Sequence, residues 1–122
     1  MLKYFGLILS IVILLINLFY FDFDDSKLSE ISKNTLKLFL NKNKNKLSRY
    51  IILGHTDTKG TNEYNLNLSY KRADVVKDIL LNEGIPEKDI SILGKGENEL
   101  AVSTPDDTRH PANRRAEVKI IN

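Results

Sequence analysis

Apolar residues along the chain follow two spacings, and these spacings predict its secondary structure. Between residues 18 and 23 every second position is a phenylalanine, which indicates a strand with Phe19, Phe21 and Phe23 on one face. Short apolar runs predict three further strands at 50–53, 90–93 and 116–121. In the last of these strands the alternation directs Val118 and Ile120 toward the core.

Two stretches instead carry apolar residues three or four positions apart, as in a helix with one buried face. The first follows the cap residues 24–26, and its predicted inner stripe is Leu28, Ile31, Thr35 and Leu38, widened by Leu36 and Phe39. The second is predicted over residues 62–82, between the cap Thr61 and the stop signal Gly84. Its predicted inner stripe is Leu66, Ser69, Ala73, Val76 and Leu80, flanked by Val75 and Ile79.

The predicted elements follow the order β-α-β-α-β-β. A strand–helix–strand unit with a right-handed crossover places its strands in one sheet and its helix on that sheet's face. We therefore expect an α/β (α+β) sandwich, with a mixed sheet and helices packed on one face. Residues 97–113 contain Pro105, Pro111 and many polar residues, and they predict a long surface loop before the last strand.

The N-terminal segment is the most apolar part of the chain. Lys3 precedes an uncharged run, residues 4–21, which is typical of a secretory signal peptide or a short membrane anchor. Small residues suited to cleavage are absent between Ser10 and Ser26, so both interpretations stay open. Residues 18–23 cannot lie in a sheet and in a membrane at once. We expect the sheet to keep them, giving a signal peptide or anchor at 1–17 and a folded domain at 18–122.

Composition excludes several classes of function. The net charge is only +2, and acidic and basic residues are interleaved, so no basic surface for nucleic acid is expected. With no cysteine, the chain has no disulfide, thiolate metal site, thiol nucleophile or lipidated N-terminal cysteine. The two histidines, His55 and His110, have no further metal ligands nearby in the sequence. We expect neither a metal nor a cofactor.

One group of residues resembles a known family. The strand 50–53 is followed by Gly-His-Thr-Asp at 54–57 and by Gly60, and the next helix carries the series Asn65, Leu68, Ser69, Arg72, Ala73 and Val76. This arrangement resembles the OmpA C-terminal family. Segments 20–28, 94–97 and 113–118 agree with the opening and closing parts of the same pattern, so the resemblance covers residues 19–121.

The resemblance implies a ligand and a site. Members of this family hold peptidoglycan non-covalently through the diaminopimelate of its stem peptide, which presents an ammonium and a carboxylate on one carbon. It implies that Asp57 receives the ammonium and that Arg72 grips the carboxylate through its planar fork. Asn65 would orient the loop or contact the ligand, and backbone groups around Thr56 and Thr58 would add hydrogen bonds.

Two further residues have alternative interpretations. Asp24 matches a family position that borders the pocket, but an aspartate at a helix start is also a common N-cap. Arg115 begins the last strand, where it could touch the glycan or brace the end of the sheet.

These expectations describe a non-enzymatic protein that tethers a membrane, most simply the outer membrane, to the cell wall from the periplasmic side. One alternative is the wall-anchoring module of a larger envelope machine, such as a flagellar stator or a secretion accessory, held in the inner membrane by an uncleaved N-terminal helix. A cell-wall hydrolase is a further alternative. It would need a poised pair of carboxylates or a metal site, and the sequence indicates neither.

Overall fold

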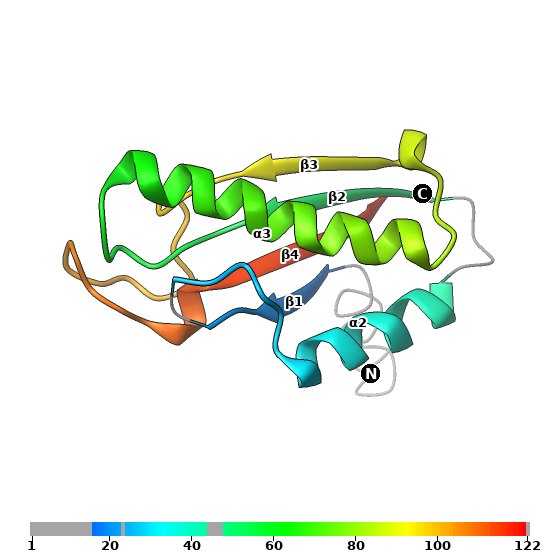
Figure 1. Ribbon diagram of the computed structural model, residues 1–122, viewed down its shortest axis with the longest axis horizontal. Helices are drawn as coiled ribbons and strands as arrows, with labels where there is room; N and C mark the ends of the chain where they lie inside the picture. The colour runs from blue at the N-terminus through cyan, green and yellow to red at the C-terminus, as the bar shows by residue number, and fades with distance from the viewer. Residues whose placement is uncertain (1–15, 23, 44–47, 122) are drawn as a thin grey trace, which may run out of the picture.

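The computed structural model describes residues 16–22, 24–43 and 48–121, and it forms two layers. Four strands make one sheet, β1 (Ile16–Tyr20), β2 (Arg49–Gly54), β3 (Ile90–Gly94) and β4 (Arg115–Ile121). The helices α2 (Glu30–Asn43) and α3 (Asn62–Asn82) both cover one face of this sheet (Figure 1). Two short 3-10 turns, Glu87–Asp89 and Pro111–Asn113, precede β3 and β4.

The sheet is mixed, as the element order predicts. Its strand order is β1-β4-β2-β3, so the last strand lies in the middle, antiparallel to β1 on one side and to β2 on the other. β2 and β3 run parallel, and α3 forms the crossover between them. The prediction of a sandwich with helices on one face is confirmed. The carboxyl ends of β2 and β3 lie at the same edge of the sheet, which is where the pocket described below is found.

The first strand differs slightly from the predicted one. β1 begins at Ile16, two residues before the expected boundary, and ends at Tyr20. Phe21 continues the alternation through an isolated bridge to Leu28, and both Phe19 and Phe21 are buried. The expected signal peptide or anchor therefore overlaps the sheet at residues 16 and 17. Its other residues, 1–15, lie outside the described part of the chain, as does Phe23.

The predicted inner face of the first helix is only partly right. Leu28, Leu36 and Phe39 are buried as expected. α2 begins at Glu30, and Ile31 and Leu38 are 81% and 63% exposed, with Thr35 also on the outside. Its buried side chains are Ser32, Leu36, Phe39 and Leu40, a set that has helical spacing as well. Phe39 packs against Phe19 of β1 with ring centroids 6.5 Å apart. Contact with the strand decides which face is buried.

The second helix agrees closely with its prediction. The bounds of α3 are those expected, and Ser69, Ala73, Val76 and Leu80 are buried in the core. Leu66 is the exception, because it is 41% exposed and its place on the inner face is taken by Asn65 and Leu68.

Small residues let α3 approach the sheet closely. A Cβ atom at Gly54 would lie 1.8 Å from the carbonyl oxygen of Ser69, so the end of β2 tolerates no side chain there. The Ser69 hydroxyl donates to the carbonyl of Leu66 and accepts from the backbone N–H of Gly96. This contact fixes the first half of α3 against the ends of β2 and β3.

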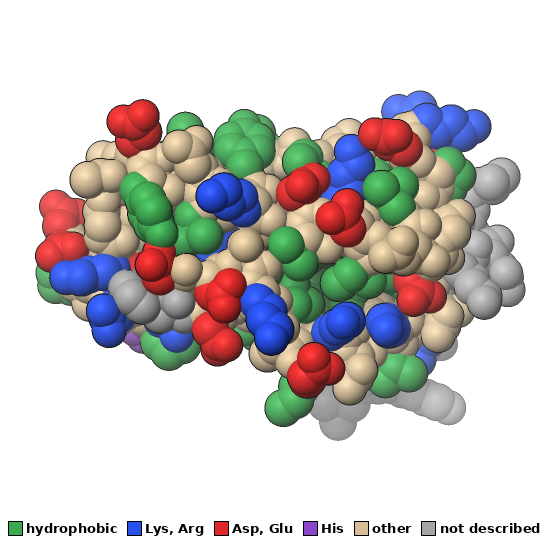
Figure 2. Space-filling model, viewed as in Figure 1, with side chains coloured by type: hydrophobic (Ala, Val, Ile, Leu, Met, Phe, Trp, Pro, Cys, Tyr) green, Lys and Arg blue, Asp and Glu red, His purple; other side chains and the backbone are tan. Residues whose placement is uncertain are grey.

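Apolar side chains remain visible on the outside where the two helices meet. Figure 2 shows hydrophobic side chains between α2 and α3 and a mixture of acidic and basic side chains around them. Leu28, Val75 and Ile79 line a shallow hollow of about 260 Å³ there. Neither described helix combines the length and hydrophobicity that crossing a bilayer requires.

The assignment of the buried face of α2 is tested by two leucines on opposite sides of the same helix. Leu36→Ala removes a fully buried side chain and is expected to lower the free energy of unfolding by about 3 kcal/mol. Leu38→Ala is expected to change it by less than about 0.5 kcal/mol, because Leu38 is exposed. Urea denaturation of the two variants measures both values. Equal losses would show that the helix faces are assigned incorrectly.

Candidate ligand-binding site

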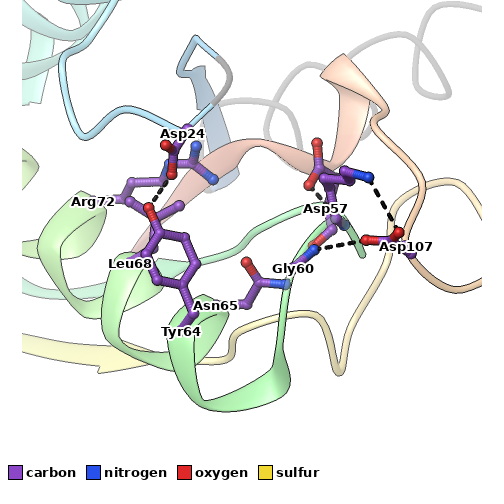
Figure 3. Close-up of a pocket in the computed structure, with 9 residues that line it drawn as sticks. Asp24, Asp57, Gly60, Tyr64, Asn65, Leu68, Arg72 and Asp107 are labelled. Atoms are coloured by element: carbon purple, nitrogen blue, oxygen red, sulfur yellow. Dashed lines mark hydrogen bonds and ion pairs between the residues drawn. The ribbon is translucent and has the colours of Figure 1, made fainter.

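A pocket of about 330 Å³ lies at the carboxyl end of β2. Three loops and one helix meet around it, and its described lining is Asp24, Asp57, Lys59, Gly60, Tyr64, Asn65, Leu68, Arg72 and Asp107. Asp24 comes from the β1–α2 loop, Asp107 from the loop before β4, and the residues from Tyr64 to Arg72 from α3. Figure 3 shows Asp57 and Arg72 on opposite sides of this pocket. The structure thus brings together two residues whose proximity no sequence spacing indicates.

Asp57 is a buried carboxylate held by several donors. It is 3% exposed, and its two carboxylate oxygens accept from the backbone N–H groups of Lys59 and His110, each at 3.2 Å. The guanidinium of Arg114 lies 3.4 Å from Oδ2 of Asp57 and forms an ion pair with it. Asp57 therefore presents its carboxylate to the pocket in a fixed orientation.

Arg72 is the largest fully buried side chain among the described residues, at 1% exposure. Its Nε, Nη1 and Nη2 atoms donate to the backbone carbonyls of Asp25, His55 and Asp22 at 2.9, 3.0 and 3.1 Å. The guanidinium also lies 5.3 Å from the ring centroid of Phe21, within the range of a cation–π contact. Burial lowers the pKa of Arg72 to about 10, and the charge of Asp57 opposes this shift. The side chain remains a cation at neutral pH.

Arg72 therefore has a structural role as well as a place in the pocket. Its three bonds join the β1–α2 loop to the β2–α3 loop, so it organises the walls around it. A guanidinium has five N–H donors, and these three bonds leave one N–H on each terminal nitrogen. The Asp57–Arg72 interaction is electrostatic across the pocket, since the direct ion pair of Asp57 is with Arg114.

Asn65 orients the loop that carries Asp57. Its side-chain amide donates to the backbone carbonyl of Asp57 at 3.2 Å, and the residue is 1% exposed. Thr56 and Thr58 are also buried, but they do not line this pocket. Thr56 bonds to the neighbouring backbone, and the Thr58 hydroxyl donates to the carbonyl of Pro105 at 2.8 Å. Both threonines hold the loops in place.

The rim of the pocket contains residues that the sequence did not indicate. Lys59 forms an ion pair with Asp107 at 3.1 Å, and the N–H of Gly60 donates to the same carboxylate. The hydrogen bond from Gly60 and the pairing with Lys59 lower the pKa of Asp107. Asp24, which the sequence did indicate, accepts a hydrogen bond from the hydroxyl of Tyr64.

Asp24 and Asp107 share an unusual backbone conformation. Their φ angles are 53° and 56°, and in the described part of the chain they are the non-glycine residues with positive φ. Such conformations are uncommon outside glycine and tend to occur at functional sites. Both aspartates line the same pocket, which supports its assignment as the functional site.

Arg115 lies outside the lining of this pocket. It is buried, it pairs with Glu117 at 2.9 Å, and it donates to the carbonyl of Glu99. These contacts brace the end of the sheet, which is one of the two roles expected for it. The neighbouring Arg114 is the arginine that reaches Asp57.

His55 lies beside the Arg115–Glu117 ion pair, with its Nε2 atom 3.5 Å from the Glu117 carboxylate. The residue is fully buried, and neither ring nitrogen has a hydrogen-bond partner within the described residues. Burial, together with the charge of Arg115, lowers the pKa of His55 to about 4, although Glu117 and Glu99 act in the opposite direction. The imidazole is therefore neutral at neutral pH, and its backbone carbonyl supports Arg72.

The depressed pKa of His55 predicts a pH dependence of stability. His55 takes up its proton near pH 6.5 in the unfolded chain and near pH 4 in the folded chain. Its contribution to the free energy of unfolding is therefore fully present above about pH 6.5 and is lost as the pH falls toward 4. An NMR titration of the two imidazoles, assigned with His110→Gln, measures the pKa directly. A His55 signal that titrates at or above pH 6 would contradict this prediction.

The pocket thus has a fixed carboxylate, that of Asp57, on one side and a fixed guanidinium, that of Arg72, on the other. Such a pair suits a small zwitterion, whose ammonium and carboxylate lie on one carbon. The described residues include no group of three or more histidines, aspartates or glutamates placed to hold a metal ion.

Most of the chain is similar in sequence to known proteins. The model of the OmpA family matches residues 20–114. The chain is 31% identical over 104 residues to the peptidoglycan-associated lipoprotein of Pseudomonas aeruginosa, which covers 85% of this chain and 62% of that protein. It is 35% identical over 102 residues to outer membrane porin F of the same organism, covering 82% of this chain and 29% of the porin.

The fold of the chain is also found in a solved structure. The crystal structure of the peptidoglycan-associated lipoprotein from Burkholderia pseudomallei superposes with a TM-score of 0.73 at 28% identity, covering 85% of this chain and 89% of that one. The matched region is thus the same folded unit in proteins of different length. This chain spans less than two thirds of the length of either curated relative.

Proposed function

Because the chain belongs to the OmpA family, we propose that it binds peptidoglycan non-covalently through the diaminopimelate of the stem peptide. The observation that carries the proposal is the pocket in which Asp57 and Arg72 lie on opposite sides. One relative is a peptidoglycan-associated lipoprotein, which supports the choice of polymer.

The chemistry of the pocket fits the free end of diaminopimelate. Its ammonium would lie against Asp57, where it competes with or displaces the 3.4 Å contact to Arg114. Its carboxylate would take the N–H groups that Arg72 has not used for the loop carbonyls. Asn65 and Asp24 would complete the contacts, since both line the pocket. Each charge of the ligand then meets an opposite charge that is already oriented.

The pocket walls reduce the cost of binding. The carboxylate of Asp57 and the guanidinium of Arg72 are already fixed by hydrogen bonds within the protein, so little side-chain freedom is lost when a ligand binds. Binding of this kind is equilibrium recognition of one amino acid within a polymer and involves no chemical step.

We propose further that the domain works on the periplasmic side of the envelope and holds a membrane, most simply the outer membrane, to the wall. The names of the two curated relatives, one a lipoprotein and one an outer membrane porin, support this location. Attachment through residues 1–17, as a signal peptide that directs export or as an anchor, is part of the same proposal.

Asp57→Asn tests the proposed function, because it removes the anion and keeps the shape of the side chain. The full chain is expected to co-sediment with purified diaminopimelate-type peptidoglycan, and Asp57→Asn is expected to lower its affinity at least about tenfold through loss of a charge-assisted contact. Asp74→Asn is the matched control, since Asp74 is exposed on α3 and lies outside the pocket lining.

Circular dichroism of both variants checks that the fold is intact. Arg72 is less suitable for this test, because replacing it breaks three bonds that hold the loops. Wild-type protein that fails to sediment with the wall would refute the proposed function. Binding that is undiminished in Asp57→Asn would refute the site.

A further inference from the structure

Tyr64 is a half-exposed aromatic side chain that lies across one side of the pocket. It is 48% exposed and sits in the first turn of α3, where its backbone N–H donates to the cap residue Thr61. A Cβ atom at Gly60 would lie 3.6 Å from Cδ1 of its ring. At the other end of the side chain, the hydroxyl donates to the carboxylate of Asp24 (Figure 3). The ring therefore extends from the β2–α3 loop toward the β1–α2 loop.

Apart from Tyr64, Leu68 and Gly60, the described lining residues of the pocket are polar or charged. Among its described lining residues, Tyr64 and Leu68 supply the large apolar surfaces. Leu68 is 9% exposed and belongs to the inner face of α3, whereas the Tyr64 ring is open to solvent. An aromatic ring with an apolar face and a bonded hydroxyl is suited to a ligand that carries both methylene groups and charges.

We propose that Tyr64 determines specificity at this site by packing its ring on the aliphatic chain of the ligand. This inference rests on the proposed function and deepens it. The zwitterionic end of diaminopimelate engages Asp57 and Arg72, and its three methylene groups then leave the pocket along the Tyr64 ring. Burial of methylene groups against the ring adds affinity that a shorter zwitterion cannot gain.

Tyr64 also positions Asp24. The hydrogen bond to Asp24 raises the pKa of Tyr64. It also fixes the carboxylate of a residue whose backbone φ angle is positive. This holds the β1–α2 loop, which Arg72 ties down from the inside through the carbonyls of Asp22 and Asp25. The two contacts keep the loop at a constant distance from α3, so the width of the pocket is set before a ligand binds.

A comparison of two ligands separates ring packing from a general effect on structure. NMR titrations of the full chain with meso-diaminopimelate and with D-alanine measure both affinities. D-alanine carries one ammonium and one carboxylate on a single carbon, as each end of diaminopimelate does, but it lacks the methylene chain. Tyr64→Ala is expected to weaken diaminopimelate about tenfold and D-alanine less than about twofold. Tyr64→Phe keeps the ring and is expected to retain most of the discrimination between the two ligands.

Tyr70→Ala is the matched control. Tyr70 lies on the same helix, is 40% exposed and packs over Gly94, so its removal is expected to leave both affinities unchanged. An equal loss of both ligands in Tyr64→Ala, or no loss of either, would overturn the proposal for Tyr64. Neither result touches the proposed function, which is refuted if the wild-type protein fails to sediment with the wall.

Discussion

A buried guanidinium is the constraint on which this site depends. A charge that is 1% exposed is tolerated only when its donors are satisfied, and Arg72 satisfies three of them with backbone carbonyls from two separate loops. The loops must therefore adopt the conformation that presents those carbonyls. The same conformation places Asp24 on one side of the pocket and Asp57 on the other. Folding and ligand recognition share one residue.

The close packing of α3 on the sheet makes this arrangement possible. Gly54 and Ser69 let the helix approach the end of β2, and the approach brings Arg72 beneath the loop that starts at His55. On the opposite face of the sheet, the neutral His55 and the pair of Arg115 with Glu117 fill the space behind the same loop. The pocket is thus supported from both sides by polar groups that are not exposed to it.

Much of the fold could be predicted from the sequence, because strands and α3 carry strong local signals. Tyr50 to Leu53, the cap at Thr61 and the stop at Gly84 correspond to the observed elements. The buried face of α2 was predicted only in part. The predicted stripe contained Ile31 and Leu38, which are exposed, as well as Leu36 and Phe39, which are buried. Both pairs fit helical spacing, and only contact with β1 distinguishes them.

The candidate site, too, could be predicted only in part. A family resemblance indicates Asp57 and Arg72, and the structure places both in one pocket. Tyr64, Lys59 and Asp107 were missed, because their contacts join loops some 40 to 48 residues apart and leave no periodic pattern. At the N-terminus, β1 uses residues 16–20 of the uncharged run, so in the folded sheet these residues are not available to a membrane.

The central claim is that one zwitterionic carbon bridges Asp57 and Arg72. The most direct measurement is a ¹⁵N NMR titration with meso-diaminopimelate and, in parallel, with Nα-acetyl-lysine amide, whose only charged group is the side-chain ammonium. The account predicts saturable shifts at the Arg72 side-chain Nε–H and at the backbone N–H groups of Lys59 and His110, which hold the Asp57 carboxylate. It predicts much weaker binding of the blocked lysine, because that compound has no carboxylate for Arg72. Equal binding of both compounds, or shifts confined to other parts of the molecule, would contradict it.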